Sequence, residues 1–222
     1  DFFEQAQRFP QNVSKLQDYF SKENDTAKVR AFPAEGTNVP IWILGSSMES
    51  AALAAAYGLP YAFAGHFAPR QMIQAFEFYR ENFQASAVLD KPKTMACVNI
   101  IAADTNEEAE LLSTSLYQMF LNLIRHDRKG LQPPVPSLDD IMNEQERFHV
   151  DQMTACTFIG NKEQLKTEDE PVKLGLVAPN FPFILIFTKL IRTNHQLNVF
   201  YMNNGESFAY CYGRKPLSRR CA

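Results

Sequence analysis

The feature that most constrains this chain is a threefold alternation of short apolar segments with segments of helical pattern. The apolar segments have the length and the β-branched and aromatic content of buried strands. The predicted strand and helix pairs are residues 40–45 and 51–56, 61–64 and 70–83, and 94–103 and 104–125. Successive strand–helix units predict parallel strands joined by right-handed crossovers. The alternation fits either part of an eight-stranded barrel or an open doubly wound sheet, and it does not distinguish them.

Three further helices are predicted outside these units. Phe9 and Pro10 precede apolar residues at helical spacing, so we expect a helix over residues 9–20 with Pro10 in its first turn. A helical stretch is expected at roughly 138–155, and a last helix is expected to begin near Gly160.

Length and composition place the chain among globular proteins. It has 222 residues, of which 45% are hydrophobic and 21% charged, as in ordinary soluble domains. The formal net charge of −3 argues against nucleic acid as a partner. The apolar run 181–191 is too short for a membrane span, and no signal peptide is expected at the N-terminus. The four cysteines form no CxxC pair, so we expect no zinc site and a cytoplasmic location.

The charge balance changes near residue 170. Residues 1–170 contain 15 basic and 24 acidic side chains, whereas residues 171–222 contain seven basic residues and one acid, Glu206. A basic segment of this kind can be an arm that binds an acidic partner, or a foreign extension with no selected function. We therefore divide the chain into residues 1–166 and a basic, aromatic tail, residues 167–222.

The segment 44–50 is the strongest candidate for a ligand site. Gly45, Ser46, Ser47 and Ser50 lie where the first predicted strand ends and a helix begins. Unpaired amides and the helix dipole favour anions at such a position, glycine permits close approach, and serine hydroxyls donate hydrogen bonds. These residues could form a phosphate cradle without Lys or Arg. The alternative is that Ser46 or Ser47 only caps the helix, and we expect Glu49 to point to solvent.

His66 is the candidate catalytic residue. It follows the second predicted strand at its carboxyl end, where α/β folds keep their active sites, and it could donate to an oxygen of a substrate or cofactor. The alternative is a structural histidine held by hydrogen bonds. His126, His149 and His195 do not have the spacing of a metal site. The sequence contains no GxGxxG, P-loop or GxSxG motif, which weakens dinucleotide, NTPase and hydrolase interpretations.

Several blocks in order resemble the bacterial luciferase-like flavin monooxygenases, and most closely the subgroup of uncharacterised luciferase-family oxidoreductases. The blocks are residues 40–47, 54–69, 75–80, 102–109, 131–134 and 158–165. The resemblance extends over about residues 9–166 and corresponds to the C-terminal half of the family's barrel.

The resemblance implies a partial (β/α)8 barrel that uses reduced FMN and molecular oxygen to oxidise a small organic substrate, such as an aldehyde. It implies a flavin reductase as supplier of reduced FMN, and a homo-oligomer. In the family, the segment matching Ser46, Ser47 and Ser50 lies against the flavin phosphate. Luciferase has an acidic residue at the position of Ser46, so the assignment rests more on Ser47 and Ser50.

The chain departs from the family in two respects. The family's N-terminal half has no counterpart, and residues 167–222 contain no family residues. Missing strands leave open sheet edges, and Phe181–Thr188 is a candidate to pair with one of them. Two alternatives follow: a non-catalytic half-barrel that serves assembly or dimerisation, and a relative that uses the deazaflavin F420 in place of FMN.

Overall fold

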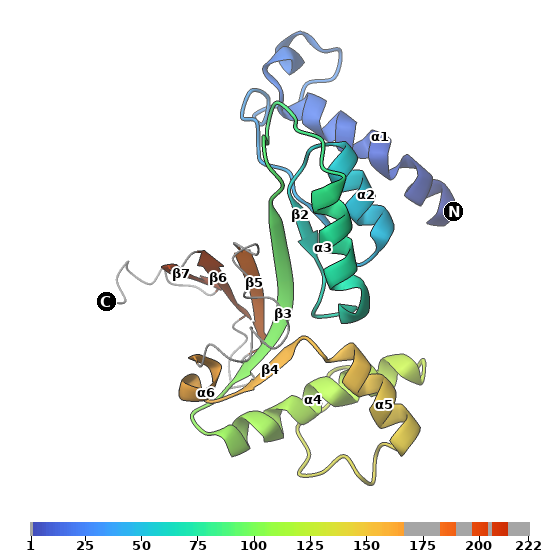
Figure 1. The fold of residues 1–222 in the computed structure, drawn as a ribbon, viewed down its shortest axis with the longest axis vertical. Helices are drawn as coiled ribbons and strands as arrows, with labels where there is room; N and C mark the ends of the chain where they lie inside the picture. Colours follow the sequence, from blue (N-terminus) through green and yellow to red (C-terminus); the bar gives the residue numbers. More distant parts are fainter. Residues whose placement is uncertain (1, 167–182, 190–196, 204–205, 213–222) are drawn as a thin grey trace.

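Three parallel strands form the centre of the computed structural model, which describes residues 2–166, 183–189, 197–203 and 206–212. They are β1 (Ile43–Gly45), β2 (Tyr61–Phe63) and β3 (Thr94–Ala102), and each is followed by a helix: α2 (Met48–Ala56), α3 (Met72–Glu81) and α4 (Asn106–Ile124). β2 pairs in parallel with β1 on one side and with β3 on the other. The three predicted strand–helix units are therefore confirmed (Figure 1).

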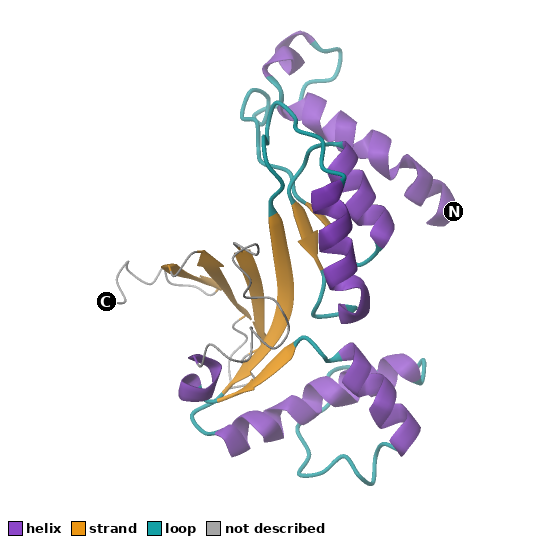
Figure 2. Ribbon diagram, viewed as in Figure 1, coloured by secondary structure: helices purple, strands orange, loops and turns teal. Residues whose placement is uncertain are grey.

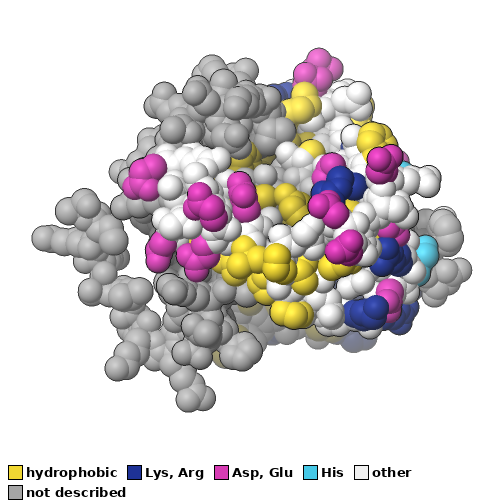
Figure 3. Space-filling view, turned by 90° about the horizontal axis from the view of Figure 1, so that it is seen from below, with side chains coloured by type: hydrophobic (Ala, Val, Ile, Leu, Met, Phe, Trp, Pro, Cys, Tyr) yellow, Lys and Arg dark blue, Asp and Glu magenta, His cyan; other side chains and the backbone are white. Residues whose placement is uncertain are grey.

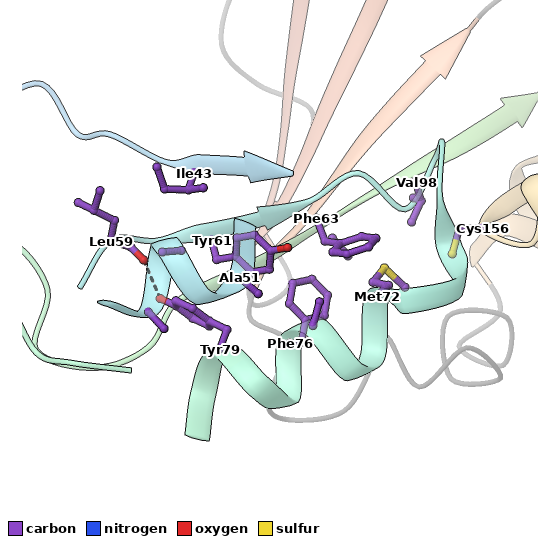
Figure 4. Close-up of a cluster of buried hydrophobic side chains, with 14 of the residues drawn as sticks. Ile43, Ala51, Leu59, Tyr61, Phe63, Met72, Phe76, Tyr79, Val98 and Cys156 are labelled. Atoms are coloured by element: carbon purple, nitrogen blue, oxygen red, sulfur yellow. Dashed lines mark hydrogen bonds between the residues drawn. The ribbon is translucent and has the colours of Figure 1, made fainter. Parts of the chain in front are cut away.

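The main core lies between these strands and the helices α2 and α3, which run along one side of the sheet (Figure 2). Tyr61 and Phe63 lie two residues apart on β2, so their side chains share a face. Both contact Phe76 of α3, with ring centroids 5.9 and 6.0 Å away, and Tyr61 also lies 5.5 Å from Tyr79. The Tyr79 hydroxyl donates to the Leu59 carbonyl at 2.9 Å, which satisfies a polar group inside this aromatic cluster (Figure 4).

A second core forms where β3 continues beyond β2. The strand β4 (Thr157–Gly160) pairs in parallel with the carboxyl half of β3, and α4 packs there against α5 (Glu144–Met153). Arg125 at the end of α4 binds Glu146 of α5 through two hydrogen bonds of 2.7 and 2.8 Å. Hydrophobic side chains gather on this face of the molecule between basic and acidic ones (Figure 3).

The opposite edge of β3 is occupied by part of the tail. The strand β5 (Phe183–Lys189) runs parallel to β3, and β6 (Leu197–Asn203) and β7 (Glu206–Tyr212) extend the sheet by antiparallel pairing. Ala96 of β3 is in register with Phe63 on one side and Ile184 on the other, which places β5 at the edge away from β2. The predicted pairing of residues 181–188 with an open edge is confirmed for 184–188, which are in register with β3, while 181–182 lie outside the described residues.

Several boundaries differ from the prediction. Helix α1 (Phe2–Phe20) begins well before Pro10, which therefore lies inside the helix rather than in its first turn. Helix α5 begins at Glu144 instead of about residue 138, because Asn143 and Glu146 form a reciprocal capping box there. The strand β4 was not predicted.

Three short helices complete the described chain: η1 (Lys22–Thr26), η2 (Pro69–Gln71) and α6 (Lys162–Lys166). The last of them lies where a helix after Gly160 was expected. Among the described residues, no helix combines the length and the apolarity that crossing a bilayer requires. His195 and the basic end of the tail, residues 213–222, lie outside the described residues.

Candidate functional site

The carboxyl ends of β1 and β2 open onto a cavity of about 530 Å³. Its wall combines the turn after β1, the loop after β2, the end of α4 and one face of α5. The lining residues are Ser46, Phe67, Ala68, Pro69, Arg70, Gln71, Ile124, His149, Gln152 and Met153. Loops at the carboxyl ends of parallel strands are where α/β folds carry their ligand sites, and the volume suits a small organic ligand.

Gly45 and Ser50 build the turn after β1. A Cβ atom added at Gly45 would lie 2.1 Å from Ser50 Oγ, so the turn requires glycine. Ser50 Oγ donates to the Ser47 carbonyl at 2.7 Å and lies 2.9 Å from the Tyr61 hydroxyl. Burial raises the pKa of Tyr61 to about 12, so its hydroxyl stays protonated at neutral pH. The Ser50 hydroxyl therefore stabilises the turn from within.

Ser47 occupies the N-cap position of α2, although its side chain makes no capping hydrogen bond. Two hydrogen bonds lower the pKa of the Glu49 carboxyl, one from the Ser47 hydroxyl and one from the backbone N–H of Glu49 itself. Glu49 is exposed, as predicted, but its carboxylate is also held at the start of the helix. A carboxylate at this position places negative charge beside the predicted phosphate cradle.

Ser46 is the predicted binding residue that lines the cavity. It is half-buried and follows Gly45 directly at the end of β1. The structure thus separates the four predicted residues by position: Ser46 faces the cavity, Gly45 and Ser50 shape the turn, and Ser47 starts the helix. Their binding of phosphate stays a prediction.

His66 lies immediately before the cavity wall, in the loop after β2. Its backbone N–H donates to the Cys97 carbonyl at 2.7 Å, and its carbonyl accepts from Asn99 Nδ2 at 2.9 Å. Both bonds join His66 to β3, while the next residue, Phe67, lines the cavity. Burial lowers the pKa of the half-buried His66 imidazole, which is therefore neutral at pH 7. A catalytic role for His66 stays a prediction.

Four polar residues of the cavity were not among the predicted site residues: Arg70, Gln71, His149 and Gln152. The first two belong to η2, whereas the other two belong to α5. Arg70 Nε donates to Gln152 Oε1 at 3.0 Å, across 82 positions of sequence. The position of Arg70 just after a predicted strand was a usable signal, but nothing local connects residue 70 with residue 152.

These observations define an α/β protein with a ligand-sized cavity at the carboxyl ends of its parallel strands. A family model described as luciferase-like monooxygenase matches residues 15–168. The chain therefore belongs to the luciferase-like monooxygenase family, as its sequence blocks predicted.

Individual relatives agree with this family. The chain is similar to a luciferase-like monooxygenase of Escherichia coli strain K12, with 44% identity over 158 residues, which are 71% of this chain and 47% of that protein. It is similar to YvbT of Bacillus subtilis strain 168, with 46% identity over 163 residues, 73% of this chain and 48% of that protein. The chain thus spans about half the length of these curated relatives.

A solved structure supports the fold class. The crystal structure of apo-MsnO8 matches with a TM-score of 0.63 at 19% sequence identity, covering 84% of this chain and 56% of that chain. Together with the parallel sheet and its helices, this likeness identifies the fold as part of the luciferase-like α/β barrel.

Proposed function

We propose that this chain is part of a monooxygenase that uses reduced FMN and molecular oxygen to oxidise a small organic substrate, of the aldehyde class. The observation that carries the proposal is the cavity at the carboxyl ends of β1 and β2, in a member of the luciferase-like monooxygenase family. Delivery of reduced FMN by a separate flavin reductase, and self-association of the protein, belong to the same proposal.

The residues present fit the phosphate end of FMN. Ser46 offers a hydroxyl donor and Arg70 a permanent positive charge, and the cavity lining contains no Asp or Glu. Phosphate is held in proteins by such donors, and the start of α2 adds partial positive charge beside Ser46. Gly45 and Ser50 would position Ser46, because their close packing sets the shape of the turn.

The rest of the cavity wall suits the organic part of a cofactor or substrate. Phe67, Ile124 and Met153 are apolar and come from three different elements. Bound reduced FMN would supply the electrons for oxygen chemistry, and these side chains would exclude water from it. The neutral imidazole of His66, next to Phe67, would serve as a hydrogen-bond donor or acceptor rather than as a cation.

Titration of the chain with FMN tests the proposal. Ser46→Ala should weaken FMN binding by about 1–3 kcal/mol, because a phosphate oxygen loses a donor. A Ser47→Ala, Ser50→Ala double variant should weaken it by a comparable amount, through lost donors and a loosened turn. Ser137→Ala is the matched control, since Ser137 is an exposed serine outside the cavity that bonds Asp139. Unchanged FMN affinity in both test variants would overturn the phosphate assignment.

Three further measurements address the proposal and its alternatives. A full-length relative supplied with reduced FMN and oxygen should convert a candidate aldehyde to the corresponding acid and yield more acid than the same mixture without the protein. Tighter binding of F420 than of FMN would favour the deazaflavin alternative. A chain that binds neither cofactor and sediments only as an assembly would favour a non-catalytic half-barrel module.

A further inference from the structure

We propose that Arg70, oriented by Gln152, provides the counter-charge for a doubly charged phosphate monoester in the cavity beside Ser46. This inference rests on the proposed function, because the phosphate monoester it concerns is the end group of FMN. It assigns a role to two residues outside the serine turn.

Arg70 differs from three other arginines of the described chain in its partner. Arg30, Arg125 and Arg147 form ion pairs with Glu35, Glu146 and Asp139, respectively. Arg70 instead donates from Nε to the neutral amide oxygen of Gln152, and within the described residues it forms no ion pair with a carboxylate. Its positive charge is therefore not neutralised by the residue that holds it.

The hydrogen bond to Gln152 also fixes the direction of the guanidinium group. A guanidinium has five N–H donors in a rigid plane, and Gln152 takes only the one on Nε. The bond joins η2 to α5, and residues of both elements line the same cavity. Orienting the side chain in advance reduces the entropy that anion binding would cost.

The surroundings favour an anion over a neutral ligand. Arg70 and Ser46 line one cavity whose lining contains no carboxylate that could compete for the guanidinium. Arg70 is solvent-exposed, so its attraction to an anion comes mainly from charge-assisted hydrogen bonds and not from a low local dielectric constant. The planar donors of arginine match two oxygens of a phosphate group, a geometry that lysine does not offer.

The experiment compares FMN with riboflavin, which has the same ring system but lacks the phosphate. Dissociation constants are measured by flavin fluorescence for wild type, Arg70→Gln, Arg70→Lys and Gln152→Ala. Arg70→Gln should weaken FMN binding at least about tenfold, because a charge-assisted hydrogen bond is lost, and leave riboflavin binding unchanged. The FMN dissociation constant of Arg70→Lys should lie between those of wild type and Arg70→Gln. Gln152→Ala should raise the FMN dissociation constant less than Arg70→Gln does.

Arg128→Gln is the control, because Arg128 is also exposed but does not line the cavity. Circular dichroism verifies that each variant is folded. Equal losses for FMN and riboflavin in Arg70→Gln, or no loss for either, would overturn the inference while leaving the proposed function intact.

A parallel titration with inorganic phosphate distinguishes failure of the proposed function from failure of the role assigned to Arg70. If wild type binds phosphate but not FMN, and Arg70→Gln abolishes phosphate binding, the proposed function fails and the role of Arg70 stands. If wild type binds neither FMN nor phosphate, both are overturned.

Discussion

Ser50 Oγ and the Tyr61 hydroxyl lie 2.9 Å apart, so the first turn of α2 is joined directly to β2. The Tyr61 hydroxyl also donates to the Ser47 carbonyl at 3.2 Å, which ties the start of the helix to the same strand. These contacts fix the turn that follows β1 against the neighbouring strand β2. That arrangement sets the position of Ser46 at the cavity.

The close approach of Gly45 to Ser50 predicts a specific non-additivity. Gly45→Ala should destabilise the fold by about 1–3 kcal/mol, because its Cβ would overlap the Ser50 side chain. In a Ser50→Gly variant the Oγ and Cβ atoms are gone, and the nearest remaining atom of residue 50 is Cα, at 3.8 Å. Most of the destabilisation caused by Gly45→Ala should therefore disappear in that variant. Urea unfolding of the four variants of this cycle measures the coupling. Equal costs of Gly45→Ala in both backgrounds would contradict the overlap.

Removing the Tyr61 hydroxyl should loosen the same turn. Tyr61→Phe should cost about 1 kcal/mol, since its hydrogen bonds are lost and the ring packing is kept. Ser50→Ala should lower the free energy of unfolding less in the Tyr61→Phe variant than in the wild type, because the Ser50 and Tyr61 hydroxyls share one hydrogen bond. Denaturant titrations of both single variants and the double variant test this, and strict additivity would show that the hydroxyls act independently.

The aromatic core should be sensitive to truncation on one face of α3. Phe76→Ala should lower the free energy of unfolding by about 3–5 kcal/mol, because a fully buried ring is replaced by a cavity. Ile73→Ala on the same helix is the control, since its side chain is 38% exposed, and it should cost far less. Comparable losses from both substitutions would mean that the buried face of α3 is wrongly assigned.

The link between α4 and α5 should depend on pH. Hydrogen bonds from the Arg125 side chain and the Asn143 backbone lower the pKa of Glu146 from 4.5 to about 2. A depressed carboxyl pKa stabilises the fold fully above the unfolded value, and that contribution is lost as pH falls through the folded value. Glu146→Gln should therefore be less stable than wild type at pH 7, with the difference vanishing between about pH 4.5 and pH 2.

Thermal unfolding followed across this pH range gives the measurement. The loss at pH 7 should be small compared with that of Phe76→Ala, because Arg125 is exposed and Glu146 is only partly buried. A difference between Glu146→Gln and wild type that persisted unchanged at pH 2 would exclude this ion pair as its source.

Glu49 should oppose anion binding at the start of α2. Its lowered pKa keeps the carboxylate ionised at neutral pH, next to the Ser47 hydroxyl. Glu49→Gln should therefore tighten FMN binding severalfold and leave riboflavin binding unchanged, as fluorescence titration would show. Glu107→Gln, in the first turn of α4, is the matched control. Weaker FMN binding by Glu49→Gln would mean that this carboxylate supports the site rather than opposing it.

Secondary structure was predictable where it is determined by residues close in sequence. The strands β1, β2 and β3 and the helices after them follow from apolar runs and helical spacing, and Thr105 caps α4 by accepting from the Glu108 backbone N–H. The strand β4 escaped prediction because it has only four residues and forms by pairing with β3, nearly sixty positions earlier. A four-residue segment is too short to show a clear alternation of apolar and polar residues, so only its pairing with β3 makes it recognisable as a strand.

By itself, the sequence determined the strand–helix alternation, the family, and the glycine–serine turn after β1, because each depends on neighbouring residues or on blocks in order. Only the tertiary structure decided which of those serines reaches the cavity and that Arg70 and Gln152 meet there. The cavity is built from four segments far apart in the chain. Its charge and shape arise from packing among them, and local sequence patterns carry no record of such packing.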